Sequence, residues 1–289
     1  MQFARAVALS TLLARSTLRA SSLALQCAMP LALGGCISVS TSGCGSWSTI
    51  EGTRELSVAH QAASPLVVKT GNGSITLVQG GSTEVAISAQ VRARTQERLD
   101  AVQIVAQRLT DGTLNLSAAW PGGKPLSNEG CAFTVTIPDV SRINAETSNG
   151  RIEVQGLAGS ADLSTSNGKI QTTNFPGEVV ARTSNGSIEL TDVTKADADT
   201  SNGSISITLR ADASGPVRAD SSNGSITLRV GPGFNGDVIA DTNNGGVSCD
   251  APGATVVRKG RTSGQFNFGA TGLTHTLDTS NGSILIQGR

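Results

Sequence analysis

The sequence predicts an all-β fold in the form of a parallel β-helix, a solenoid with rungs of about 18–21 residues. A motif of the type Thr-Ser-Asn-Gly recurs at nearly constant spacing through the second half of the chain. Apolar and polar residues alternate on both sides of each motif. The 289 residues include 34 glycines and only 3% aromatic residues, which is unusual for an ordinary globular core and typical of a repetitive one.

Residues 1–35 are typical of a bacterial secretory signal peptide. Three arginines and no acidic residue lie in the first 19 positions, and residues 22–33 are largely apolar. This apolar stretch is shorter than the roughly 20 residues that a helix needs to cross a bilayer. The sequence therefore predicts export rather than a transmembrane helix.

A candidate lipid-attachment site follows the apolar stretch. The segment Leu33–Cys36 (LGGC) resembles a bacterial lipobox, in which the cysteine becomes the lipidated first residue of the mature protein. Two or more acyl chains on Cys36 would hold the protein at a membrane, because a single chain gives only reversible binding. Cys44 is a weaker candidate for the same role. The alternative is ordinary signal-peptide cleavage nearby, with Cys36 as an incidental thiol.

The remainder divides into a tether and one repetitive domain. Residues 36–64 are rich in Ser, Thr, Gly and Ala, and we expect them to form a flexible tether. Residues 65–289 form the domain, with an irregular part at 65–140 that starts or caps the regular repeats of 141–289. Three stretches in the irregular part alternate as strands do: residues 83–91, 102–106 and 113–118. The apolar residues within 99–109 are also spaced for a helix, but the flanks favour strands.

The repeat is marked by eight glycines. They are Gly150, Gly168, Gly186, Gly203, Gly224, Gly245, Gly264 and Gly282, and successive glycines are 17–21 residues apart. Seven of them follow an asparagine, Ser263 precedes Gly264, and Gly73 after Asn72 is an earlier outlier. Asn and Gly tolerate the left-handed φ of a tight corner. Each unit is therefore expected to be a strand, a turn and a strand.

Aligning the units on the glycine places apolar residues in columns. Residues two and four places after the glycine are mostly apolar, as at Ile152 and Val154, and the residue between them is mostly polar. The same parity holds five and seven places before it, with Lys259 as an exception. A Thr or Ser three places before each glycine has this inward parity as well. We expect these hydroxyls to form a turn-stabilising ladder rather than an ice-binding or glycan-binding face.

Stacking accounts for these columns better than hairpins, the alternative that Asn-Gly turns also favour. One unit buries about two large side chains, which contributes about 3–6 kcal/mol. Ordering about 18 residues costs about 1–2 kcal/mol for each residue. A single unit is therefore unstable, whereas parallel stacking adds backbone hydrogen bonds and a continuous core.

A family resemblance supports this architecture. The segment Phe133–Pro138 (FTVTIP), then Ala145–Val154 (AETSNGRIEV) and its repetitions, resemble the bacterial putative-adhesin domain family over residues 64–289. The resemblance implies a right-handed β-helix-like fold, a place in the cell envelope or at the cell surface, and a role in adhesion. It implies no catalytic or binding residues.

Charged residues are few and balanced. Lys and Arg number 22, as do Asp and Glu, so no basic surface is expected to hold a nucleic acid. The densest acidic group is Asp192, Asp197 and Asp199 with Lys195, which we interpret as a solvated loop. The sequence contains no Walker, Rossmann or Gly-x-Ser-x-Gly motif, and we expect no catalytic residue and no cofactor.

Histidines and cysteines give no strong signal for a site. His60 and His275 lie far apart without ligand-spaced neighbours, so no metal site is expected. Cys44, Cys131 and Cys249 are an odd set, which leaves one disulfide of unknown pairing open. Cys249 has core parity, and we interpret it as a small buried apolar residue.

Together these features predict a lipid-anchored, non-enzymatic protein of the bacterial cell envelope, at the outer membrane or cell surface, that acts as an adhesin or binding scaffold. Ile37 after the cysteine, in place of Asp, favours the outer membrane. The expected partners are the membrane, through the lipid on Cys36, and a glycan or an envelope protein. The alternative is a carbohydrate-active β-helix enzyme, a polysaccharide lyase or hydrolase.

Overall fold

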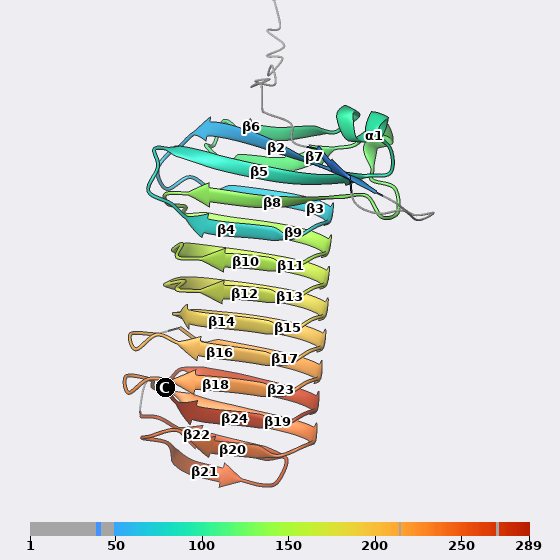
Figure 1. Cartoon of the computed structure of the whole chain (residues 1–289). Coiled ribbons are helices and arrows are strands. Elements are labelled where there is room, and N and C mark those ends of the chain that lie inside the picture. The colour runs from blue at the N-terminus through green and yellow to red at the C-terminus, as the bar shows by residue number, and fades with distance from the viewer. Residues whose placement is uncertain (1–38, 42–48, 214, 270–271) are drawn as a thin grey trace, which may run out of the picture. The chain divides into compact units, whose positions relative to one another are not determined.

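The computed structural model describes residues 39–41, 49–213, 215–269 and 272–289. The predicted signal peptide, Cys36 and Cys44 lie outside these residues. The described part contains two twelve-stranded sheets (Figure 1). Its helices are α1 (Gln96–Ala101) and the 3-10 helix η1 (Pro121–Gly123). The prediction of an all-β fold with long parallel sheets is confirmed.

The spatial order of the strands in each sheet differs from their order in the chain. The first sheet contains, from one end to the other, β1 (Val39–Thr41), β2 (Ile50–Ala59), β5 (Glu84–Ala93), β8 (Gly130–Ile137), β4 (Ile75–Gln79), β10 (Ile152–Gln155), β12 (Ile170–Thr173), β14 (Ile188–Val193), β16 (Ile205–Leu209), β18 (Ile226–Val230), β24 (Ile284–Gly288) and β20 (Val247–Asp250). The second sheet contains β21 (Thr255–Lys259), β22 (Ser263–Asn267), β19 (Asp237–Asn244), β23 (Thr274–Asn281), β17 (Val217–Asn223), β15 (Lys195–Asn202), β13 (Gly177–Asn185), β11 (Gly159–Asn167), β9 (Arg142–Asn149), β3 (Leu66–Asn72), β7 (Leu114–Ala119) and β6 (Gln103–Arg108).

Each rung of the stack has one strand from each sheet, joined by the Asn-Gly corner. The strand before the corner lies in the second sheet and the strand after it in the first, as in β9 and β10. Neighbouring rungs pair in parallel with like residues in register, for example Asn149 with Asn167 and Ile152 with Ile170. Parallel stacking therefore forms the repeat, and the hairpin alternative is wrong for these rungs.

The chain does not visit the rungs in sequence order. Strands β3 and β4, which contain the outlier Asn72–Gly73 corner, form a full rung between β7–β8 and β9–β10. At the other end, β23 and β24 insert between β17–β18 and β19–β20 (Figure 1). The eight stacked corners therefore include Gly73 and not Gly264.

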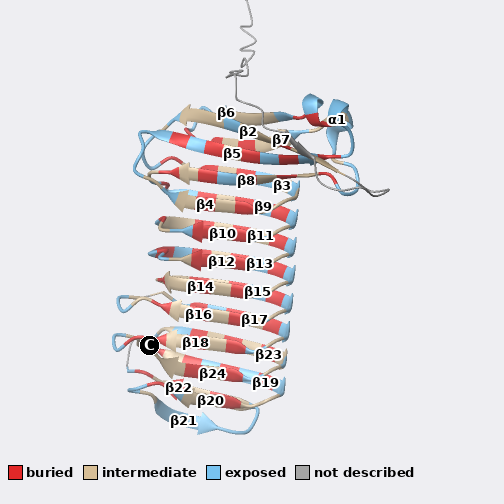
Figure 2. Cartoon of the chain, in the orientation of Figure 1, coloured by how far each residue is buried: buried red, intermediate tan, exposed pale blue. Residues whose placement is uncertain are grey.

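The unit around Gly264 departs from the repeat. Its strand β22 runs antiparallel to β19, and β21 runs antiparallel to β22. All five residues of β21 are exposed, which Figure 2 shows as a pale blue strand at the end of the stack. Lys259 in an apolar column and Ser263 in place of asparagine are the two sequence exceptions, and both belong to this unit. Lys259 is exposed, so the position that is apolar and buried in the other units lies outside the core in this one.

The structure corrects the boundary of the tether and confirms the strands predicted for the irregular part. Residues 50–59, expected to belong to the tether, form β2, which pairs antiparallel with β5 along ten residues. The strands expected at 83–91, 102–106 and 113–118 are confirmed as β5, β6 and β7. Residues 96–101, for which no strand is predicted, form helix α1, and Thr95 caps its first turn by accepting a hydrogen bond from Arg98 N at 3.2 Å. Leu99 of this helix is fully buried and packs beside Gly52 of β2.

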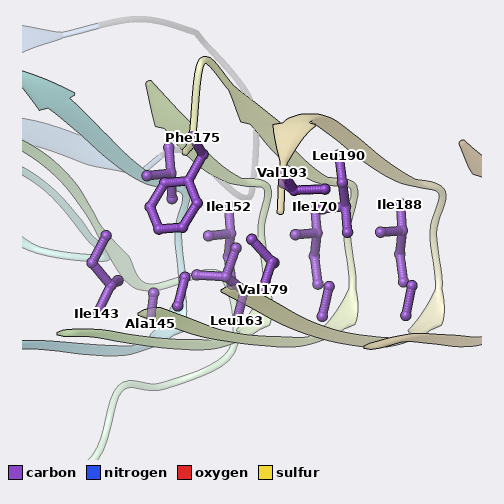
Figure 3. Close-up of a cluster of buried hydrophobic side chains, with 14 of the residues drawn as sticks. Ile143, Ala145, Ile152, Leu163, Ile170, Phe175, Val179, Ile188, Leu190 and Val193 are labelled. Atoms are coloured by element: carbon purple, nitrogen blue, oxygen red, sulfur yellow. The ribbon is translucent and has the colours of Figure 1, made fainter. Parts of the chain in front are cut away.

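The core is one continuous apolar layer between the sheets. Isoleucines two places after the corners, replaced by Val247 in one rung, follow one another along the stack, as Ile152, Ile170 and Ile188 do in Figure 3. These side chains are fully buried, and the buried residues of successive strands line up along the stack in Figure 2. Each rung therefore completes the core of its neighbours, which rigidly positions the corners described next.

Candidate functional site

The corner glycines are required by contact between rungs. Only Gly73 among the eight stacked glycines has a positive φ, so the expected left-handed corner is wrong for the others. A Cβ added at Gly168 or Gly186 would overlap the carbonyl oxygen of the preceding corner glycine. The same overlap recurs along the column, so the corner admits glycine because backbones approach closely there.

A buried row of hydroxyls joins the corners. Thr165 Oγ1 donates to the carbonyl oxygen of Gly150 at 3.1 Å, and Thr183 Oγ1 donates to that of Gly168 at 3.1 Å. Equivalent bonds of 2.8–3.0 Å recur at the other corners. The seven members of the column that make these bonds are at most 6% exposed, whereas Thr262 in the unit around Gly264 is exposed. The interpretation as a turn-stabilising ladder, and not a binding face, is confirmed.

An exposed row of asparagines, the amide ladder, runs along the same edge. Its members in spatial order are Asn72, Asn149, Asn167, Asn185, Asn202, Asn223, Asn281 and Asn244. Seven bonds of 2.7–3.0 Å link neighbours, with every Nδ2 donating to the Oδ1 of the rung nearer Asn72. Exposed serines such as Ser166 and Ser184 lie beside the ladder. The edge is therefore an ordered polar surface whose side chains are held in place before any ligand arrives.

A cleft of about 680 Å³ lies at the head of the amide ladder. Its lining comes from five segments that are far apart in sequence: Glu51, Asn72–Ser74, Gln90 with Arg92, Ser127–Gly130 with Ala132, and Asn149. Arg92 contacts Glu51 Oε1 with Nη2 at 2.7 Å and with Nε at 2.8 Å, and Gln90 Nε2 donates to Glu51 Oε2 at 3.1 Å. These groups line a polar hollow that the amide ladder enters through Asn72 and Asn149.

A buried carboxylate anchors the loop that forms one wall of the cleft. The Glu129 side chain is 0% exposed, and its two oxygens accept bonds at 2.7 Å from Arg98 Nε and Nη2. They also accept bonds from Arg94 N at 3.2 Å and from Leu126 N at 2.9 Å. The Arg98 hydrogen bond, aided by the backbone bonds, lowers the pKa of Glu129 to about 2 despite its burial. Glu129 therefore holds α1 and the loop together as an ionised, fully bonded group.

An acidic column lies on the outer face of the second sheet. Asp199, Asp220, Asp278 and Asp241 are paired in register on four adjacent parallel strands. Burial raises the pKa of Asp278, and its neighbours Asp220 and Asp241 raise it further. The sequence hides this column because β23 inserts between β17 and β19.

The acidic group named from the sequence does not form one site. Asp192 pairs with Arg289 at 2.6 Å, Asp197 lies 3.5 Å from Arg182, and Lys195 lies 3.3 Å from Glu178. Asp199 is the exception, because it belongs to the acidic column. Positions 195–202 form strand β15, so the expected loop is a strand with charges on its outer face.

The two histidines lie in separate places. His60 directly follows β2, and its Nε2 lies 3.1 Å from Asp139 Oδ2. His275 is 1% exposed and occupies an apolar column, where Nδ1 accepts from Val217 N at 3.2 Å and Nε2 lies 3.0 Å from Asn235 O. Burial lowers the pKa of His275, so we interpret it as a neutral structural side chain.

The cysteines within the described ranges are free thiols. Cys131 is buried, and burial raises its pKa to about 12. Cys249 is half-buried against the core, in agreement with its inward parity. No group of three His, Cys, Asp or Glu side chains within the described residues is arranged to hold a metal ion. Among the helices of the described segments, none has the length and apolarity needed to cross a bilayer.

Comparisons with known proteins show a family match and several distant structural similarities. The family model described as Toastrack DUF4097 matches residues 55–286. A putative adhesin from Bacteroides fragilis is 13% identical, with 82% of this chain and 97% of that chain covered and a TM-score of 0.38. A putative cell adhesion protein from Clostridium sporogenes is 12% identical, with 82% and 100% covered and a TM-score of 0.33. A putative lipid binding protein from Parabacteroides distasonis is 15% identical, with 83% and 96% covered and a TM-score of 0.29. No curated protein matches the sequence.

Proposed function

Because this chain belongs to the Toastrack DUF4097 family, we propose that its solenoid is the exported, lipid-anchored and non-enzymatic binding module of a bacterial cell-envelope protein. The lipobox-like segment that ends at Cys36 supports the anchor. The right-handed winding of the rungs that the family resemblance implies is part of the same proposal. The solenoid would stand at the outer membrane or cell surface and contact a glycan or another envelope protein.

The amide ladder is the observation that carries the binding role. Its eight asparagines are fixed by side-chain bonds of 2.7–3.0 Å on one edge, and all of them except the half-buried Asn72 are exposed. Groups that are ordered before binding lose little conformational entropy when a ligand arrives. A row of equivalent groups also allows several weak contacts to act together on one extended ligand, as adhesion requires.

One experiment tests both the anchor and the edge. Cells producing the wild-type protein, Cys36→Ser, or Ser166→Glu with Ser184→Glu and Ser201→Glu are labelled with palmitate, fractionated, and measured for adhesion to glycan-coated and cell-coated surfaces. Cys36→Ser is expected to lose the label and leave the membrane fraction. The triple variant is expected to stay anchored but lose most adhesion, because bulky charges cover the edge beside the ladder.

A matched variant on another face controls for general charge effects. Thr173→Glu, Thr191→Glu and Thr208→Glu add three charges to the outer face of the first sheet, and we expect adhesion close to wild type. Palmitate on Cys36→Ser would show that the anchor is elsewhere. Equal loss of adhesion in the serine and threonine triple variants would show that the edge with the amide ladder is not the binding surface.

A carbohydrate-active enzyme is the second candidate, and the acidic column favours it. Neighbouring strands in a sheet lie about 4.8 Å apart, close to the separation of the two carboxyl groups in retaining glycosidases. Asp278, with its raised pKa, has the property of a general acid. Sustained turnover of acidic or neutral polysaccharides by the wild-type protein, with or without Ca²⁺, and its loss in Asp278→Asn would establish this function.

Asp278→Asn is also expected to raise the free energy of unfolding at pH 7 by about 0.2–1 kcal/mol, because it removes like charges placed directly opposite across strands. The Asp278 pKa is raised above 3.8 in the folded state, so its contribution to stability is complete below pH 3.8 and is lost as the pH rises through the folded pKa. The variant should lack that pH-dependent loss in urea unfolding. Asp162→Asn, whose carboxylate lies 4.0 Å from Arg182, serves as the control and should not stabilise. A lower free energy of unfolding for Asp278→Asn than for wild type would contradict repulsion between Asp278 and its neighbours Asp220 and Asp241.

A further inference from the structure

We propose that the cleft at the head of the amide ladder is a binding site for a neutral saccharide. The inference rests on the proposed binding function and adds a place and a chemical class of ligand to it. The cleft has about 680 Å³ of space, within the range of sites that hold small ligands.

The walls of the cleft are built before a ligand binds. The four bonds to Glu129 fix the loop 126–130 against α1. Asn128 in this loop has a φ of 67°, a conformation that non-glycine residues rarely adopt and that often occurs at functional sites. On the floor, a Cβ at Gly130 would overlap Asn72 O, so the loop lies directly against the first rung of the ladder. The exposed Asn128 amide is thereby held at the rim.

The charges of the cleft favour an uncharged ligand. Glu51 is neutralised by Arg92 at 2.7 Å, and Glu129 by Arg98 at 2.7 Å. An anion would meet the Glu51 carboxylate, and a cation would meet the Arg92 guanidinium. Because each charge already has its partner, a charged ligand would gain little and would have to displace an existing ion pair.

The remaining lining groups match a polyhydroxylated ligand. Asn128, Asn149 and Gln90 carry amides, and Ser74 and Ser127 carry hydroxyls, all of which both donate and accept hydrogen bonds. Ala132 is the sole lining side chain that contains only carbon. Sugar hydroxyls also donate and accept, and a carboxylate such as Glu51, with its side chain 26% exposed, can accept from them.

A peptide fits the cleft less well. Extended peptides commonly bind by adding a strand to a free sheet edge. The strands that supply lining residues are β2, β3, β5, β8 and β9, and each is already hydrogen-bonded to a strand on both sides. A peptide would therefore depend on side-chain contacts alone.

Calorimetric titration of the full chain tests the proposal. The probes are maltotriose, cellotriose and triacetylchitotriose as neutral saccharides, trigalacturonate as an anionic one, and trialanine as a peptide. At least one neutral trisaccharide is expected to bind, and Glu51→Gln should weaken it at least tenfold. Ala132→Tyr, which fills the cleft opposite Gln90, should weaken it by at least the same factor.

Glu55→Gln is the matched control. Glu55 is the next carboxylate on the same face of β2, is exposed, and accepts from Ser88 Oγ at 2.7 Å outside the cleft. Its substitution should leave the affinity within twofold of wild type. Binding of trigalacturonate or trialanine alone, no binding by any neutral trisaccharide, or equal affinity in Ala132→Tyr would overturn the proposal.

The adhesion assay separates this inference from the proposed function. If no trisaccharide binds while adhesion still depends on the serines beside the ladder, the cleft inference fails and the binding role stands. If the wild-type protein neither binds a saccharide nor adheres, both fail.

Discussion

Gly186→Ala is expected to lower the free energy of unfolding by about 3 kcal/mol, the upper end of the usual cost of overpacking. The added Cβ would overlap the carbonyl oxygen of Gly168 in the neighbouring rung. Neither backbone can move away, because each corner is bonded on both sides, as Gly186 N is to Asn202 O at 3.1 Å. Equilibrium unfolding in urea measures the change.

Gly81→Ala is the control for this substitution. Gly81 is exposed in the connection between β4 and β5, and a Cβ there meets no atom within 4 Å. Its effect should stay within about 0.5 kcal/mol, as for most surface changes. Similar losses in the two variants would show that the corner tolerates a side chain and that the close approach of backbones does not select glycine.

Glu129→Gln is expected to destabilise the protein by about 3–5 kcal/mol, the cost of removing one partner from a buried ion pair. Glutamine cannot accept all four bonds that fix the loop, and the Arg98 guanidinium loses its anion. The loop 126–130 and α1 should loosen first, which hydrogen exchange at Leu126 and Arg94 would detect as faster amide exchange. The measured quantities are the free energy of unfolding and these local exchange rates.

The same carboxylate makes the stability of the protein fall in acid. Its pKa falls from 4.5 to about 2 in the folded state, so its contribution is fully present above pH 4.5 and is lost as the pH falls through about 2. Glu129→Gln should therefore lose less stability than wild type between these pH values. Glu97→Gln, an exposed change on α1, should leave both stability and pH dependence unaltered. An equal pH dependence in wild type and Glu129→Gln would contradict the assignment.

The repeating part of the fold could be predicted because its information is local. A period of 17–21 residues, the two-residue alternation and the inward threonines all lie within one unit. These features determine the corner, the parity of each strand and the buried hydroxyl row. The left-handed φ expected to explain the corner glycines is wrong for seven of the eight stacked corners. The close approach of a carbonyl oxygen, which does explain them, depends on the neighbouring rung and cannot be recognised from the φ preference of Asn-Gly.

The order of the rungs could not be predicted, because it depends on contacts between units and not on residues within one unit. Strand β23 has the same alternation of buried and outward residues as the other strands of the second sheet. Nothing within residues 274–281 therefore specifies which strands become its neighbours. The departure at Gly264 did leave a signal, because Lys259 and Ser263 break two columns in one unit. Two exceptions within one unit therefore indicate that this unit, which forms β21 and β22, ends the parallel stack.

The cleft was missed because its residues are separated by up to 98 positions, from Glu51 to Asn149. None belongs to a recognisable motif, and Glu51 lay in the segment expected to be a tether. The strand β2 has mixed polar and apolar residues because only one side of it faces the core. Its alternation at Leu56 and Val58 was the available clue.

The late insertion of β24 affects how the molecule resists pulling. A terminal strand of a stack is held by one neighbour and can be peeled away one hydrogen bond at a time. Strand β24 is bonded to β18 on one side and to β20 on the other, and Arg289 N adds a bond of 2.9 Å to Val230 O. A force applied at Arg289 must therefore break the hydrogen bonds to both neighbouring strands at the same time. In a solenoid whose last strand lies at the end of the stack, the same force would break the bonds to one neighbour only.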